Sequence, residues 1–155
     1  MQTTVIEKRN TKARDFGNIL SKTGLGRTAT KTLGGIETVS YAYNVRSWPT
    51  KIQSPKFTEF LAYNEAANGI TPSTPQWSGR IAAQRWYHGS PTAKPLYQFT
   101  YDGVGRLTDA TYSQNMYVLN RRPKYSESLT YDAAGNITSL TRQGWLYSAT
   151  WGDID

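Results

Sequence analysis

One short phrase occurs twice in this chain, and its two copies constrain the fold more than any other feature. Residues 101–108 read YDGVGRLT and residues 131–138 read YDAAGNIT, so the copies lie thirty residues apart. Both fit the pattern Tyr-Asp-x-x-Gly-x-[Leu/Ile]-Thr. Self-similarity at a fixed period predicts a repeat architecture, in which each unit buries its apolar face against its neighbours.

Degenerate copies extend the repeat in the N-terminal direction. Residues 43–48 read YNVRSW, with Ser47 where the motif has glycine. Tyr63 and Asn64 begin another copy, whose SGRI end at residues 78–81 follows an insertion at residues 64–78. Residues 15–19 (DFGNI) keep only the end of a copy. We therefore predict about five repeats within residues 15–155, preceded by a basic segment, residues 1–14, that fits a disordered stretch.

Each motif tyrosine ends a segment in which large side chains alternate with small or polar ones. The large positions are 39, 41 and 43, then 59, 61 and 63, then 97, 99 and 101, and finally 127, 129 and 131. A period of two predicts half-buried strands. The alternation resumes after the glycine, at residues 81–86, 107–112 and 137–140, so each motif predicts a hairpin turn. The competing interpretation of residues 58–67 is a helix capped by Thr58.

The motif residues have a mechanical explanation as turn formers. An Asx side chain can accept hydrogen bonds from backbone N–H groups of its own turn, and glycine takes a positive φ at the turn exit without strain. We predict an all-β, antiparallel β-hairpin repeat array, an open section of sheet with little or no helix. The predicted structural motif residues are Tyr43, Asn44, Tyr63, Asn64, Gly79, Tyr101, Asp102, Gly105, Tyr131, Asp132 and Gly135.

Composition limits the classes of function that remain. Cysteine is absent, so neither a disulfide framework nor a thiolate metal site can form. No signal peptide and no apolar run of membrane-spanning length is present in the sequence as written, so we expect a cytoplasmic chain if it is expressed alone. The net charge of +7 fits a solvated surface, and it leaves an anionic partner open.

The sequence offers little for catalysis or for binding a cofactor. His88 is the only histidine, and no G-x-S-x-G nucleophile pattern accompanies it. The acidic residues are dispersed and single out neither a glycosidase pair nor a calcium loop. Residues 24–27 and 103–106 resemble nucleotide-binding loops, but neither completes G-x-G-x-x-G before a helix, so both predict turns. We predict no catalytic, cofactor-binding or metal-ligating residue and a non-enzymatic protein.

Aromatic and basic residues make the one candidate ligand surface. Trp86 and Tyr112, beside Arg85, could stack on sugars or on single-stranded nucleic acid, with Tyr117, Arg121 and Arg122 nearby in sequence. The favoured interpretation is packing, because Trp86 and Tyr112 each stand seven residues after a motif glycine and so occupy equivalent return-strand positions.

These motifs resemble the YD repeats of the RHS family, which also occur in teneurins and in bacterial polymorphic toxins. The resemblance rests on residues 101–108, on YDAAGNITSLTR at 131–142 and on YAYNVRSW at 41–48, which is similar to RHS repeats of Bacteroidetes. It implies an antiparallel sheet that spirals into a hollow shell around a C-terminal cargo, commonly a toxin, in a secreted or cell-surface parent protein.

The chain is too short to close such a shell, and it lacks the protease-like motif that precedes released toxins. We therefore expect a structural piece of the repeat array. Its expected partners are the rest of the parent array and its cargo, and the open sheet edges could also self-associate. The alternative is a module that binds carbohydrate or another cell-surface polymer through exposed aromatic residues; nucleic acid is a less favoured partner.

Overall fold

The computed structural model describes residues 19–89, 94–114, 125–145 and 151–154 as one antiparallel sheet. Its eleven strands follow the order of the chain, each hydrogen-bonded to the next, and no helix occurs among these residues. The strands are β1 (Ile19–Lys22), β2 (Thr28–Leu33), β3 (Glu37–Tyr43), β4 (Pro49–Gln53), β5 (Phe57–Ala62), β6 (Ala83–His88), β7 (Pro95–Tyr101), β8 (Leu107–Gln114), β9 (Glu127–Tyr131), β10 (Ile137–Trp145) and β11 (Trp151–Ile154).

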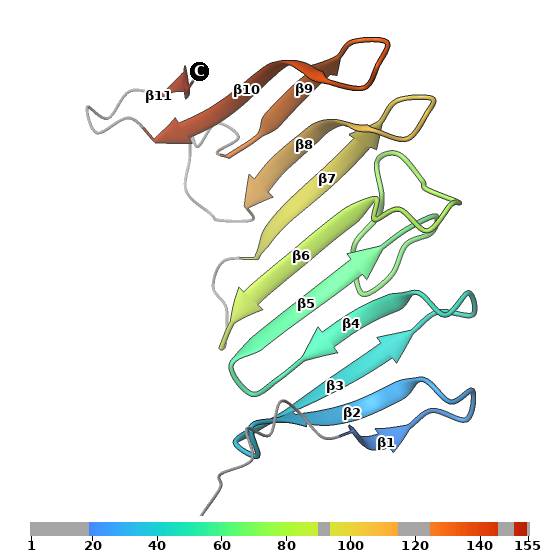
Figure 1. The fold of residues 1–155 in the computed structure, drawn as a ribbon. Helices are drawn as coiled ribbons and strands as arrows, with labels where there is room; N and C mark the ends of the chain where they lie inside the picture. Colours follow the sequence, from blue (N-terminus) through green and yellow to red (C-terminus); the bar gives the residue numbers. More distant parts are fainter. Residues whose placement is uncertain (1–18, 90–93, 115–124, 146–150, 155) are drawn as a thin grey trace, which may run out of the picture.

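The connections sort onto the two opposite ends of the strands (Figure 1). The motif turns, which join β1 to β2, β3 to β4, β7 to β8 and β9 to β10, lie along one edge, together with the inserted segment between β5 and β6. The connections between β2 and β3 and between β4 and β5 lie along the other edge. The prediction of an all-β hairpin array is confirmed. The alternative helix at residues 58–67 is wrong, since residues 57–62 form β5, which pairs on both sides with β4 and β6.

An irregularity in strand pairing recurs beside the motif turns. The register shifts between Ala42 and Tyr43, between Thr100 and Tyr101, and between Ile137 and Ser139. A bulge bends its strand and increases the local twist. Three of the hairpins are therefore bent at the same point, next to the motif tyrosine.

Strand register divides the side chains between two faces. Directly paired residues of an antiparallel sheet share a face. One face, which we call the aromatic face, carries Trp86, Tyr97 and Tyr112, since Gln84 pairs with Tyr97 and Tyr97 pairs with Tyr112. The other, which we call the loop face, carries Ala62, Ala83, Phe60, Arg85 and Leu96.

The best-buried part of the sheet lies where the inserted segment covers the loop face. Ile70 of that segment is 1% exposed and packs with Ala62 and Ala83, and the partly buried Phe60 and Leu96 surround this cluster. The small side chains of the two alanines let the segment approach the sheet closely. The core is therefore central, over β5 to β7, rather than distributed evenly along the array.

Several predictions fall on residues outside the part that the structure describes. These are the basic segment at residues 1–14, residues 15–18 of the DFGNI copy, and Tyr117, Arg121 and Arg122. The strands beside the undescribed stretches have definite ends: β7 begins at Pro95 and β8 extends to Gln114. The described residues include no helix that is long and apolar enough to cross a membrane.

Candidate functional site: the tyrosine ladder

The motif turns are built by the side chain of the Asx residue. Asp102 Oδ1 accepts hydrogen bonds from the backbone N–H groups of Val104 (3.1 Å) and Arg106 (2.8 Å). The backbone closes the same loop, because Asp102 N donates to Arg106 O and Gly105 N donates to Asp102 O, both at 2.9 Å. Donors that would otherwise point into solvent at a tight turn are therefore satisfied within five residues.

The same geometry recurs in the other copies. Asp132 Oδ1 accepts from Asn136 N at 2.8 Å, and Asn44 Oδ1 accepts from the N–H groups of Arg46 and Trp48, each at 3.0 Å. At the exit of these turns φ is positive, +91° at Gly105 and Gly135 and +69° at Ser47. A side chain with a Cβ is strained in this region, so Ser47 is the one strained member of the set.

The motif tyrosines connect consecutive repeats. Each donates its hydroxyl hydrogen to the backbone carbonyl of the residue that begins the return segment of the preceding repeat. We call this series the tyrosine ladder; its hydrogen bonds are Tyr43 to Thr28 O (2.9 Å), Tyr63 to Pro49 O (2.9 Å), Tyr101 to Ile81 O (2.8 Å) and Tyr131 to Leu107 O (2.7 Å). One phenol therefore fixes the register of each repeat on the one before it.

The residue after the motif glycine completes the ladder. It packs against the tyrosine ring of the next repeat, as a guanidinium over the ring in three copies and as an indole in the fourth. The pairs are Arg27 with Tyr43 (4.9 Å), Trp48 with Tyr63 (5.0 Å), Arg80 with Tyr101 (5.9 Å) and Arg106 with Tyr131 (4.6 Å). A cation over a tyrosine ring contributes about 0.5–1 kcal/mol at exposed sites.

Two of these arginines also bond to the next turn. Arg27 Nη1 donates to Asn44 O at 3.2 Å, and Arg106 Nη1 donates to Asp132 O at 3.0 Å. Arg106 Nε is in addition 2.6 Å from Asp102 Oδ2. One guanidinium thus joins the Asx residue of its own turn to the ring and the carbonyl of the next repeat.

The ladder shifts the pKa of its acidic and phenolic groups in opposite directions. Hydrogen bonds from the Arg106 backbone, followed by those from its side chain, lower the pKa of Asp102, and hydrogen bonds from Asn136 lower the pKa of Asp132. Burial raises the pKa of Tyr63 and Tyr101. Both directions preserve the ladder at neutral pH, since the carboxylates accept as anions and the phenols donate as neutral groups.

One predicted turn residue does not form the turn. Asn64 was expected to accept backbone hydrogen bonds, but its Oδ1 is buried and has no partner among the described residues. The prediction is wrong because the insertion separates Asn64 from Gly79. The backbone N–H groups that bond to the Asx side chain in the other copies therefore lie out of its reach here. Tyr63 O accepts a hydrogen bond from Gln76 N, across the insertion.

The structure adds one copy that the sequence pattern did not reveal. Thr23 takes the Asx position: Thr23 N donates to Arg27 O (2.7 Å), Gly26 N donates to Thr23 O (2.9 Å) and Thr23 Oγ1 accepts from Arg27 N (3.2 Å). The predicted turn at residues 24–27 is confirmed, and it is a motif turn. Threonine in place of the Asx residue and Lys22 in place of tyrosine hid it, although the shared G-x-G-R of residues 24–27 and 103–106 was a usable signal.

The three predicted stacking residues divide between the two faces of the sheet. Trp86 lies with Tyr112 on the aromatic face, where both contact Tyr97; the Trp86 and Tyr97 rings stack with centroids 5.6 Å apart. Arg85 lies on the loop face, because neighbouring residues of a strand point to opposite sides. Tyr112 is only 8% exposed, so it serves packing more than ligand contact.

The remaining candidate groups do not converge. His88 is exposed at the end of β6, and its ring packs against Phe57 with centroids 5.2 Å apart. Among the described residues no group of three or more His, Asp or Glu side chains could hold a metal ion. No protein-family model and no curated protein sequence matches the chain.

Proposed function

We propose that this chain is a non-enzymatic structural segment of an RHS-type repeat wall, which in its parent protein encloses a cargo or lies on the cell surface. The observation that carries the proposal is the tyrosine ladder. The same hydrogen bond joins each repeat to the next across four junctions, and a ring contact accompanies it, from arginine at three of them and from Trp48 at the fourth. A feature that repeats at each junction and contains no reactive group serves architecture.

The chemistry of the motif residues supports the same conclusion. A carboxylate and a guanidinium are common in catalytic sites. Here the Asp102 carboxylate and the Arg106 guanidinium are hydrogen-bonded to each other, to the turn and to the neighbouring repeat. Stability in such an array arises from contacts between neighbouring repeats. A wall of this kind can be extended by adding repeats without changing the local contacts.

Small-angle scattering of the chain and electron microscopy of its parent protein test the proposal. For the isolated chain we expect the scattering of a thin plate, with a thickness near the ~10 Å of one sheet layer. For the parent protein we expect hollow particles whose wall contains this segment. A solid globular parent, or turnover of peptide, ester or glycoside substrates that His88→Ala abolishes, would refute the proposal.

A second candidate is carbohydrate binding on the aromatic face. It is favoured by the continuous ring surface of Trp86, Tyr97 and Phe99, whose successive centroids are 5.6 Å and 5.8 Å apart with interplanar angles near 20°. Glycan-array binding that saturates, is insensitive to salt and is lost in Trp86→Ala would support this function. Steep salt dependence would instead indicate a polyanion.

A further inference from the structure

The inserted segment between β5 and β6 is more than a connection. The other motif turns close within five residues, whereas this one adds a segment that folds onto the loop face. Five hydrogen bonds that involve side chains hold it there. Asn68 donates to Thr50 O, Arg85 to Gly69 O and Gln98 Nε2 to Thr71 O, and Gln98 Oε1 accepts from both Ser73 N and Ser73 Oγ. Insertions in repeat proteins often form the binding face.

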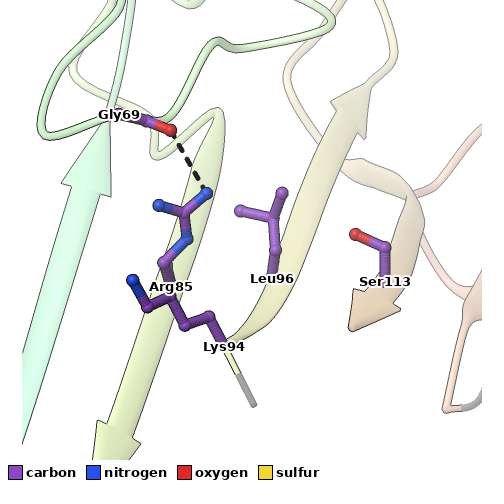
Figure 2. A pocket seen from close by; sticks show the side chains of 5 residues that line it. All are labelled: Gly69, Arg85, Lys94, Leu96 and Ser113. Atoms are coloured by element: carbon purple, nitrogen blue, oxygen red, sulfur yellow. Dashed lines mark hydrogen bonds between the residues drawn. The ribbon is translucent and has the colours of Figure 1, made fainter. Parts of the chain in front are cut away.

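A cavity of about 300 Å³ lies beside the segment, next to the buried Ile70 cluster. Its lining combines the Gly69 backbone of the insertion with Arg85 of β6, Lys94 and Leu96 at the start of β7, and Ser113 near the end of β8 (Figure 2). Cavities that bind small molecules begin at about this size. The site therefore depends on the insertion together with three consecutive strands.

The cavity is positively charged. Arg85 and Lys94 line it and no acidic residue does. Among the described residues the ion pairs lie elsewhere, between Arg106 and Asp102 and between Arg142 and Glu127. Two unneutralised cations beside one cavity favour an anionic occupant.

Arg85 is held in place and has an unused donor. Its Nη2 donates to Gly69 O at 3.2 Å, and in Figure 2 the guanidinium extends towards that carbonyl beside Leu96. Its Nε is buried and has no hydrogen-bond partner among the described residues. Solvent does not reach this Nε, so an anionic oxygen in the cavity would meet the outer guanidinium nitrogens, of which Nη1 makes no hydrogen bond to the described residues.

We propose that this cavity binds a small organic carboxylate. The donors are the outer nitrogens of the Arg85 guanidinium, the Lys94 ammonium and the Ser113 hydroxyl, which suit the two oxygens of a monoanion better than the three or four acceptors of a phosphate. Leu96 and the methylene stem of Lys94 give the body of the ligand an apolar contact. None of the lining residues belongs to the tyrosine ladder, so a test of carboxylate binding is independent of a test of the structural function.

Nuclear magnetic resonance of the arginine side chains tests the proposal directly. The Arg85 Nε–H resonance is followed in the whole chain during titration with butyrate, glucuronate and phosphate, at an ionic strength held constant with sodium chloride. We expect a saturable downfield shift with both carboxylates. Tighter binding of glucuronate would identify an acidic sugar as the source, tighter binding of butyrate an aliphatic acid, and either supports the carboxylate site.

Variants make the assignment specific. Lys94→Gln is expected to weaken binding about fivefold or more, as loss of a charged partner does. Lys56→Gln removes the same charge at an exposed position between β4 and β5 and is expected to leave binding unchanged. A linear, non-saturating shift, equal weakening by both variants, or phosphate binding as tight as carboxylate would overturn the proposal.

Discussion

Replacing Ser47 with glycine should stabilise the protein. Ser47 stands at the exit of the turn between β3 and β4 with φ +69°, where the equivalent residues are Gly26 (+77°), Gly105 (+91°) and Gly135 (+91°). The two side-chain hydrogen bonds of this turn both go to Asn44 Oδ1, and neither uses the serine hydroxyl. The substitution therefore removes strain without removing an interaction of the turn.

The expected magnitude follows from two opposing terms. A residue with a Cβ pays about 1–2 kcal/mol in the left-handed region. Glycine loses about 0.5–1 kcal/mol more backbone entropy on folding. The difference predicts that Ser47→Gly raises the free energy of unfolding by about 0.5–1 kcal/mol, which corresponds to a Tm increase of roughly 1–4 °C for a chain of this size.

Urea and thermal unfolding of matched variants measure the effect. Gly135→Ser is the reverse control, because a Cβ at Gly135 would meet nothing closer than Arg106 Nη1 at 3.9 Å, so only backbone strain changes. It should lose what Ser47→Gly gains, and the double variant should return to the stability of the parent, since distant sites are additive. A destabilised Ser47→Gly, or a neutral Gly135→Ser, would refute the assignment of strain to this position.

Three further predictions concern the ladder and its titration. Tyr131→Phe removes one ladder hydrogen bond and should lower the free energy of unfolding in urea by about 1 kcal/mol. Tyr41→Phe is the control, because Tyr41 of β3 lies outside the ladder, and it should lower this free energy by less than about 0.5 kcal/mol. Equal losses in the two variants would count against the ladder. The lowered pKa of Asp102 and Asp132 gives stability that is present above their unfolded pKa of about 3.9 and is lost as pH falls through the folded values. The double variant with Asp102→Asn and Asp132→Asn should therefore show a flatter dependence of Tm on pH below pH ~4. The raised pKa of Tyr101 gives stability that is present below its unfolded pKa of about 10 and is lost as pH rises through the folded value. In Tyr101→Phe, the loss of stability with rising alkaline pH, monitored by phenolate absorbance, should therefore be less steep.

Periodicity was sufficient to predict the sheet and its hairpins, because both depend on local pattern. The alternation before each tyrosine places β3, β5, β7 and β9, and the Asx residue with its glycine places the turns. The junctions were harder to predict. The alternation placed the motif tyrosines on the large-residue face of half-buried strands, but it gave no sign that Tyr101 and Tyr131 act through their hydroxyls.

The partners that sequence reasoning missed are distant along the chain. Ladder hydrogen bonds span 14 to 24 residues, and the arginine after the glycine acts on the next repeat rather than on its own. Recurrence of Arg27, Arg80 and Arg106 at one motif position was the available signal. The cavity near Arg85 has no such signal, since the insertion that forms it occurs once and breaks the period.

The contrast between the two kinds of arginine separates architecture from binding in this protein. Arg106 has its donors committed to an Asx carboxylate, a carbonyl and a ring of the neighbouring repeat. Arg85 stands outside the motif, donates to a single carbonyl of the insertion and lines the cavity together with Lys94. The position where the period fails, rather than the repeat itself, is therefore where this chain has the chemistry to recognise a ligand.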